Sequence, residues 1–153
     1  MTRGGRRLRA VRPEDFDSIG AFWARAWAPV YPEIDFCARL PWLKRHLVAL
    51  VARGVDVVVA LDERDAPCAL VTIDPKDGHL DQLCVAPSEK GHGLAGILLN
   101  EAKRRAPGEI ILDVNDRNVR AMAFYAREGF VRIGAGISAA GHPTTKMRWR
   151  AAV

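Results

Sequence analysis

The stretch "VAPSEKGHGLAGILLNEA", residues 85–102, decides how the rest of the chain is interpreted. It begins where an apolar, strand-like segment ends, and it finishes inside a segment whose apolar residues have helical spacing. Between these segments lie three glycines, a lysine and a histidine. Glycine adds nothing to a core and costs backbone entropy on folding. Three glycines within six residues therefore indicate a loop whose backbone has to approach something closely.

The loop is predicted to bind an anion. It leads into a helix N-terminus, where unpaired N–H groups and partial positive charge attract phosphate. Gly91, Gly93 and Gly96 allow a close approach of the backbone, and Lys90 adds a cation. The spacing also matches the dinucleotide fingerprint G-x-G-x-x-G, but that motif belongs near the first strand of a βαβ unit, whereas this one follows an antiparallel meander. A tight turn without a ligand is the alternative.

The segments around the loop predict one α+β domain over residues 1–153, built on a mixed sheet. The three strands before the loop are joined by short turns, so they must pair antiparallel. The strand, helix and strand that include the loop form one right-handed crossover, which implies a parallel pair. The predicted strands are 8–11, 55–61, 68–73, 79–85, 110–114, 130–133 and 145–149, and the predicted helices are 13–28, 35–52, 93–106 and 118–127.

A second motif, "NVRAMAFYAREGF", occupies residues 118–130. Asn118, Ala121 and Tyr125 lie at i, i+3 and i+7, so they share one face of the predicted helix. That face is a trough of small residues with an amide at one end and a phenol at the other. The alternative for Tyr125 is an aromatic side chain at the edge of the core. A neighbouring apolar stripe is expected to pack on the sheet and consists of Val119, Met122, Ala123 and Ala126.

The charge balance favours acidic partners. The formal net charge is +5 and the pI is about 9.5, so a nucleic acid and a phosphorylated cofactor both qualify. Five arginines fall within the first twelve residues, but no aromatic residues alternate with them to stack on bases. This N-terminal segment is interpreted as a solvated tail that runs into an edge strand, and nucleic acid is a disfavoured partner.

Several other classes of protein are excluded by the sequence. No apolar run approaches the ~20 residues that span a bilayer, and the basic N-terminus lacks the apolar segment of a secretory signal. We therefore expect a cytoplasmic protein without a membrane partner. Cys37, Cys68 and Cys84 lie far apart in apolar surroundings and are expected to be reduced core thiols. The four histidines lack the spacing of metal ligands, so no metal is predicted.

Taken together, the two motifs resemble those of the GNAT superfamily of acetyl-CoA-dependent N-acetyltransferases. In that family the phosphate loop reads Q/R-x-x-G-x-G/A, and a later helix reads N-x-x-A-x-x-x-Y-x-x-x-G-F. The chain departs at Lys90, because lysine keeps the charge but lacks the planar fork of arginine. The order of elements agrees along the chain, so the resemblance implies a twisted, mixed, mostly antiparallel sheet of about six to seven strands flanked by about four helices. The matching residues are Lys90, Gly91, His92, Gly93, Leu94 and Ala95 in the loop, and Asn118, Ala121, Tyr125, Gly129 and Phe130 in the second motif.

The resemblance implies an acyltransferase that moves an acetyl group from acetyl-CoA to a primary amine by direct attack in a ternary complex. The pyrophosphate would lie on the loop, and the end of the preceding strand would hold the pantetheine as an added strand. Tyr125 is the candidate general acid for the departing thiolate. The implied cofactor-binding residues are Leu83, Cys84, Val85, Lys90, Gly91, His92, Gly93, Leu94, Ala95, Gly96, Asn118, Ala121 and Tyr125.

The acceptor amine, on a small molecule or a peptide, is expected at the first two helices, as in the family. Trp27 and Tyr31 would flank a cationic amine and Glu33 would attract it. Asp81 and Gln82, on the strand before the loop, complete the predicted acceptor site. The alternative is that the aromatic residues are core and the acids are solvated.

Three questions stay open at this point. The general base is Asp81, His79, an acid near Glu33 or a water chain to solvent. The alternative function is a non-catalytic acyl-CoA-binding module, which the retention of Tyr125 disfavours, and a nucleic-acid-binding protein is supported by net charge alone. Dimers are common in the family, so a homodimer is a further expectation.

Overall fold

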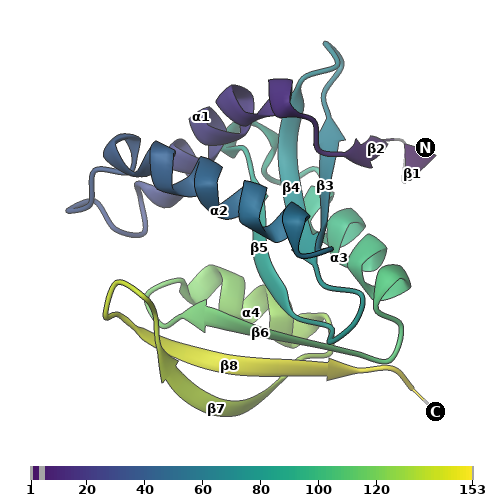
Figure 1. The fold of residues 1–153 in the computed structure, drawn as a ribbon. Coiled ribbons are helices and arrows are strands. Elements are labelled where there is room, and N and C mark those ends of the chain that lie inside the picture. Colours follow the sequence, from purple (N-terminus) through teal and green to yellow (C-terminus); the bar gives the residue numbers. More distant parts are fainter. Residues whose placement is uncertain (1, 4–5, 153) are drawn as a thin grey trace.

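The computed structural model describes residues 2–3 and 6–152 and divides them between two sheets with helices packed around them (Figure 1). The α+β class is confirmed. The strands are β1 (Thr2–Arg3), β2 (Arg6–Ala10), β3 (Asp56–Leu61), β4 (Pro67–Ile73), β5 (Leu80–Val85), β6 (Glu109–Asn115), β7 (Val131–Ile137) and β8 (Pro143–Arg150). The helices are α1 (Phe16–Trp27), α2 (Leu40–Ala52), α3 (Leu94–Arg105) and α4 (Val119–Arg127), with short 3-10 turns η1 (Pro13–Asp15), η2 (Cys37–Arg39) and η3 (Pro87–Glu89).

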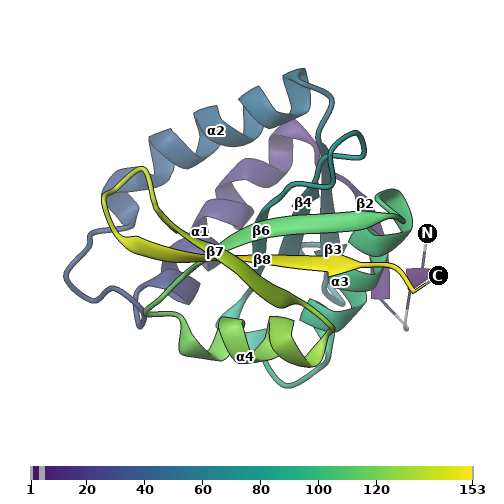
Figure 2. The same ribbon diagram turned by 90° about the horizontal axis from the view of Figure 1, so that it is seen from below.

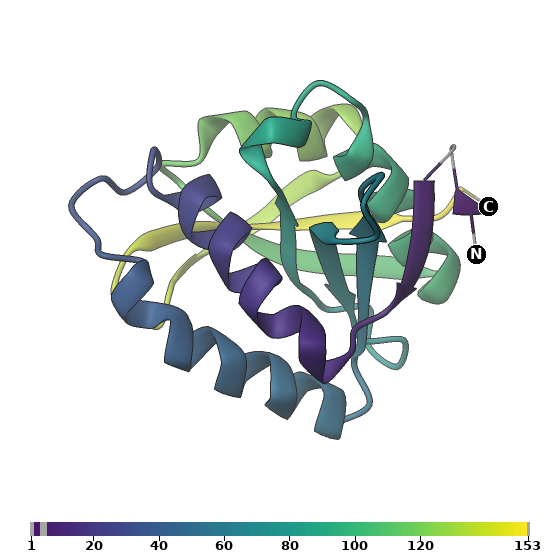
Figure 3. The same ribbon diagram turned by 90° about the horizontal axis from the view of Figure 1, so that it is seen from above.

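The larger sheet has the order β1-β2-β3-β4-β5, and every pair in it is antiparallel. Its central strands, β3 and β4, are buried along nearly their whole length. Their continuous apolar runs follow from this position, because helices cover both faces, as with α1 and α3 on β4. Figures 2 and 3 show α1 and α2 on one side of the sheets and α3 and α4 on the other.

The smaller sheet has the order β6-β8-β7 and is also antiparallel. Among the described residues, one parallel bridge, between His79 and Ile111, connects it to β5. The backbones meet closely there, because the Gly78 carbonyl accepts from the Ile111 N–H at 3.0 Å and a Cβ on Gly78 would collide with the Glu109 carbonyl oxygen. The predicted parallel pair is thus reduced to a single bridge. Beyond this bridge β5 and β6 do not pair with each other, although each keeps its other neighbour. Their carboxyl ends therefore stand apart.

A bulge in β5 interrupts the alternation of its side chains. Val71 pairs with Leu83 and Ile73 pairs with Leu80, so Asp81 and Gln82 together oppose Thr72. The buried Thr72 hydroxyl accepts hydrogen bonds from both extra N–H groups, at 3.2 and 2.9 Å. The bulge is therefore fully hydrogen-bonded, and it lets Asp81 and Gln82 both reach the side of the sheet that carries α1 and α2.

The N-terminal arginines are more ordered than the predicted solvated tail. β1 pairs with β2 at the edge of the larger sheet. Arg6 binds Glu89 at 2.9 Å, Arg9 binds Asp15 at 2.6 Å, and Arg7 forms an ion pair with Asp65. Most of the positive charge of these side chains is thus matched by carboxylates of the same chain.

The boundaries of the first two helices differ from the prediction. The residues from Pro13 and from Cys37 form 3-10 turns, and the α-helices begin later, at Phe16 and Leu40. Pro41 lies in the first turn of α2, where its missing N–H leaves no hydrogen bond unmade. None of the described helices is long and apolar enough to span a membrane.

Two expectations about burial are wrong. Cys68 and Cys84 are buried free thiols, but Cys37 is exposed because η2 lies on the surface. In the stripe expected to cover the sheet, Val119 is 70% exposed and the side chains of Ala123 and Ala126 are exposed as well. The helix instead turns its large side chains inward, since burying aromatic rings removes more apolar area from water than burying alanines. The inward residues are Ala121, Met122, Phe124 and Tyr125.

Candidate active site

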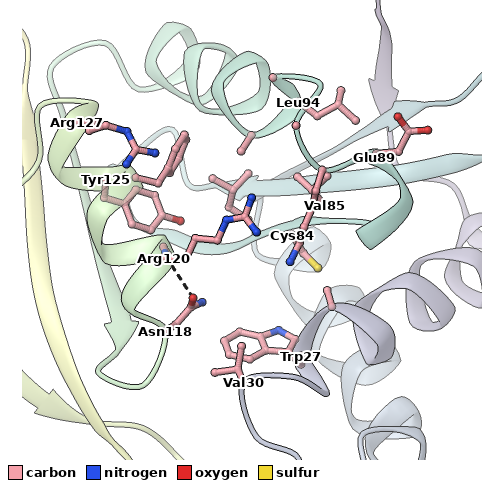
Figure 4. Close-up of a pocket in the computed structure, with 18 residues that line it drawn as sticks. Trp27, Val30, Cys84, Val85, Glu89, Leu94, Asn118, Arg120, Tyr125 and Arg127 are labelled. Carbon is pink, nitrogen blue, oxygen red and sulfur yellow. Dashed lines mark hydrogen bonds between the residues drawn. The ribbon is translucent and has the colours of Figure 1, made fainter.

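A cavity of about 380 Å³ lies between the end of β5 and α4 (Figure 4). All the predicted cofactor-binding residues line it except His92 and Gly96. Its lining comes from four parts of the chain: the end of α1, the end of β5, the glycine loop with the start of α3, and α4. Residues from both sequence motifs are therefore brought together around one cavity.

The glycine loop presents backbone N–H groups to this cavity. Gly93 is the N-cap of α3 and has a φ of 74°, in the left-handed region that glycine adopts without strain. No side chain caps the helix, so the N–H groups of its first turn have no partner within the helix. Leu94 and Ala95 belong to that first turn and line the cavity. A phosphate group at this point would satisfy the free donors.

The charged residues that line the cavity are mostly basic. Lys90 lies in the loop, and Arg120 and Arg127 extend from α4. Glu89 is the one carboxylate among the described lining residues, and Arg6 binds it at 2.9 Å. Figure 4 shows the Arg120 guanidinium reaching into the middle of the cavity between Tyr125 and Cys84. The net positive field suits a ligand that carries several phosphates.

Tyr125 is held firmly beside this cavity. Its ring makes edge contacts with Phe124 and Phe130, each with centroids 5.3 Å apart. The hydroxyl points into the cavity (Figure 4) and has no hydrogen-bond partner among the described residues. Burial raises the pKa of the Tyr125 phenol above its ordinary value, with a smaller contribution from Cys84. The hydroxyl therefore stays protonated at neutral pH and is available as a proton donor.

Cys84 lines the same cavity, but it is not poised as a nucleophile. Burial raises the pKa of its thiol to about 12, although Lys90 opposes the shift. A reactive cysteine needs a lowered pKa, since the thiolate is the nucleophilic form. Transfer through an acylated Cys84 is thus disfavoured.

Asn118 has a structural task that the sequence interpretation missed. It is the N-cap of α4, and its side-chain oxygen accepts from the Ala121 N–H at 3.2 Å. Asparagine is a preferred N-cap residue, so this role was readable from its position before the helix. The cap fixes where α4 begins and leaves the side-chain NH₂ free at the cavity wall.

A second cavity, of about 180 Å³, adjoins the first. Trp27 lines both cavities and so marks their boundary. Tyr31 and Gln82, two of the predicted acceptor-site residues, line the second one. The Tyr31 hydroxyl donates to the Asn115 side-chain oxygen at 3.0 Å, which ties the loop after α1 to the end of β6. The other lining residues are Trp23, Ile34, Phe36, Arg39, Trp42, Asn115, Ser138, Ala139, Ala140 and His142.

The structure does not bring Glu33 or Asp81 into the lining of the second cavity. Glu33 is exposed, and Arg117 binds it through two hydrogen bonds of 2.8 and 2.9 Å. Asp81 binds His46 of α2 at 2.6 Å and accepts from the Gln82 amide at 3.2 Å. Each predicted acid is therefore already paired, and Asp81 reaches the cavity only through Gln82.

A protein-family model matches most of the chain. The family model for the acetyltransferase (GNAT) domain matches residues 46–151. The chain belongs to the GNAT acetyltransferase family. This family assignment makes it an acetyltransferase. The matched region runs from the middle of α2 through the last strand and contains both motifs.

Individual GNAT proteins agree with this placement. The chain is 28% identical over 123 residues, 80% of each protein, to the peptidyl-lysine N-acetyltransferase YjaB of Escherichia coli K12. Its fold is similar to the solution structure of apo-form YjaB from Escherichia coli, with a TM-score of 0.75, 23% identity and coverage of 96% and 99%. It is also similar to a GNAT phosphinothricin acetyltransferase from Sinorhizobium meliloti in complex with AcCoA, with a TM-score of 0.74, 19% identity and coverage of 95% and 88%.

Some residues of this GNAT site were not identified from the sequence. Arg120, Phe124 and Arg127 line the first cavity and recur at i, i+4 and i+7, so their common helix face was readable. Arg39 and His142 were not readable, because they come from segments far apart in the chain. Only the folded chain places them beside the tryptophans of α1.

Proposed function

We propose that the protein binds acetyl-CoA in the first cavity and transfers its acetyl group to a primary amine that enters from the second. The observation that carries this proposal is the junction of the two cavities at Trp27, close to the end of β5. A donor and an acceptor held in adjoining cavities meet without an intermediate carrier. Holding both reactants together also removes much of the entropic barrier to their reaction.

The residues of the first cavity fit acetyl-CoA in charge and in shape. The N–H groups at the start of α3, with Lys90, would bind the pyrophosphate. Residues 83–85 end β5 beside an unpaired stretch of sheet, where their backbone groups can bind an extended amide chain as an added strand. Arg120 and Arg127 supply further cations. The AcCoA complex of the Sinorhizobium meliloti enzyme, which has the same fold, supports this assignment.

The chain's own groups have defined tasks in the reaction. A bound thioester supplies an acyl group whose carbon the amine nitrogen attacks, so a C–N bond forms and the C–S bond breaks. Tyr125 donates its phenolic proton to the departing sulfur. A free backbone N–H at the end of β5 would stabilise the carbonyl oxygen as it gains charge. The attacking amine loses its own proton to solvent water, and solvent returns a proton to the Tyr125 phenolate after the thiol leaves.

The acceptor is a primary amine on a small molecule or a peptide. The Escherichia coli relative is a peptidyl-lysine N-acetyltransferase, which supports an alkyl amine as the reacting group. The raised pKa of Cys84 supports direct attack over a covalent acyl-enzyme. A non-catalytic acyl-CoA-binding module is disfavoured, because such a module has no need of an unpartnered, protonated phenol beside the donor cavity.

The test is an acetyl-transfer assay. The protein is incubated with acetyl-CoA and a set of amines that includes a lysine peptide, a polyamine and small aromatic amines. Free thiol is detected, and the products are identified by mass spectrometry. We expect thiol release that depends on an amine and yields the N-acetylated product. Tight binding of acetyl-CoA without transfer to any amine would instead favour the non-catalytic module.

A further inference from the structure

The second cavity has an aromatic lining and one strong cation. It is lined by five aromatic side chains together with Arg39 and His142, and none of the described lining residues is acidic. We propose that the preferred acceptor is a small primary amine with an aromatic or other apolar body and a carboxylate, and that Arg39 binds the carboxylate. This inference rests on the proposed function, since it names the acceptor class of that same site. The aromatic residues are Trp23, Trp27, Tyr31, Phe36 and Trp42.

The rings form a continuous apolar surface that leads from the donor cavity to Arg39. Trp27 stacks with Phe36 at 6.2 Å, and Phe36 makes an edge contact with Trp23 at 5.3 Å. Trp23 in turn lies 6.4 Å from Trp42. Aromatic surfaces of this kind favour a flat apolar body. The cavity holds about 180 Å³, below the ~300 Å³ of typical drug-sized sites, which suits a small body.

Arg39 is available to bind a ligand. Its guanidinium stacks over the Trp42 ring, 5.0 Å from the centroid, and its side chain is half-buried. Within the described part of the chain it has no ion pair and its side chain makes no hydrogen bond. Stacking fixes the plane of the guanidinium, which leaves its fork of N–H donors free for a carboxylate.

The charged residues near the second cavity also favour a carboxylated acceptor over a polycationic one. Arg117, which packs over Tyr31 at 4.3 Å, is already paired with Glu33, and Asp81 is paired with His46. A polycationic acceptor would therefore meet Arg39 without a free carboxylate among the cavity residues. The Trp23 indole N–H is also buried and has no hydrogen-bond partner in the described residues. Arg39 thus supplies accessible donors to the cavity, and none of the described lining residues is anionic.

The experiment compares matched amines that differ in charge. Pairs are 4-(aminomethyl)benzoate with benzylamine and phenylalanine with phenethylamine, and spermidine serves as the polycation. Binding to the CoA-saturated protein is followed by tryptophan fluorescence, because tryptophans line the cavity. Acetylation of the same amines is measured separately. We expect at least one carboxylated amine to bind about tenfold more tightly than its neutral partner and to exceed spermidine.

Two variants make the test specific to Arg39. Arg39→Gln should abolish the preference for the carboxylated amine and leave CoA affinity unchanged, because Arg39 does not line the donor cavity. Arg45→Gln is the matched control, since Arg45 lies exposed on α2 outside both cavities and should keep the preference. Equal binding within each pair, tighter binding of spermidine, or an unchanged preference in Arg39→Gln would overturn the inference.

The two proposals fail in different ways. If amines are acetylated but the carboxylated ones have no advantage, the acetyl-transfer function stands and the acceptor class is wrong. If no amine is acetylated, the function fails, and the fluorescence titrations still decide whether the cavity prefers carboxylated amines. Each result therefore bears on one proposal without depending on the other.

Discussion

Tyr125 is the proposed proton donor to the departing sulfur. Its ring makes edge contacts with two phenylalanines, and its hydroxyl points into the donor cavity. Tyr125→Phe keeps the ring, so the fold and the affinity for acetyl-CoA should change little. We expect kcat to fall roughly 10²-fold with nearly constant KM, the pattern of a group that acts in the transition state. Steady-state kinetics with a saturating amine measures both quantities.

Tyr31→Phe is the matched control, because Tyr31 is the other tyrosine of the chain. Its hydroxyl binds Asn115 in the second cavity, so its loss should act on the KM for the amine and leave kcat within a few-fold. A raised KM for acetyl-CoA with unaltered kcat in Tyr125→Phe would make Tyr125 a binding residue. If neither quantity changes, another group protonates the thiolate.

Asp15 carries a prediction about stability and pH. The side chain is 3% exposed, and it accepts hydrogen bonds of 2.6 and 2.8 Å from Arg9 and 2.7 Å from the Arg12 N–H. The bonds from Arg9 hold the pKa of Asp15 below its ordinary value in the folded state. The ionised form is thus favoured by folding. Its stabilising contribution is complete above the unfolded pKa of about 3.9 and is lost as the pH falls through the lower folded pKa.

Asp15→Asn should lower the free energy of unfolding at pH 7 by about 1.5–3 kcal/mol, the range for hydrogen bonds to charged groups. The variant should also lose less stability than the wild type between about pH 5 and pH 2. Urea unfolding at several pH values measures both effects. Asp17→Asn, at an exposed position of α1, is the control and should cost less than about 1 kcal/mol. An acid profile of Asp15→Asn that parallels the wild type would refute the assignment.

Among the elements, the start of α3 carries the anion-binding claim. Gly93 caps the helix in the left-handed region, and a Cβ built there meets nothing within 4 Å. Gly93→Asp would therefore meet no steric clash, although the positive φ adds backbone strain, and it would place a carboxylate where the pyrophosphate should lie. We expect the affinity for CoA to fall by more than about tenfold while the fold persists. Calorimetry measures the affinity, and circular dichroism checks the fold.

Gly54→Asp controls for backbone strain in that experiment. Gly54 has a φ of 88°, also meets nothing within 4 Å, and follows α2 away from both cavities. Both variants should lose a similar amount of stability, but Gly54→Asp should keep its CoA affinity. If Gly93→Asp and the wild type bind CoA with equal affinity, the loop does not bind the pyrophosphate.

Some elements were predictable from the sequence and others were not. The meander and α3 were predictable, because their apolar periods are strong and glycines or prolines bound them. The bulge in β5 was not, since it depends on Thr72, which lies on the neighbouring strand and binds the extra N–H groups. Without the bulge, strict alternation would place Asp81 and Gln82 on opposite faces. The inward face of α4 was misassigned because Val119 and two alanines cost little when they are exposed.

The whole molecule explains why the two motifs form one site. The sheets touch at the bridge between His79 and Ile111 and separate beyond it, which leaves β5 with unpaired backbone at the cavity. α1 and α4 approach that opening from opposite sides of the sheets (Figure 2). The glycine loop and Tyr125 were predictable because each belongs to a local pattern. The acceptor cavity was predictable only in part, since it assembles α1, η2, β5 and the loop between β7 and β8.

We expect acetyl-CoA to lie in the first cavity, at the end of β5. A crystal structure of the protein with CoA tests it most directly. The pyrophosphate should lie on the N–H groups of residues 91–96, and the pantetheine should run along residues 83–85. The thiol should lie near the Tyr125 hydroxyl and next to Trp27. CoA bound elsewhere, or a first cavity that stays empty with CoA in excess, would refute this placement.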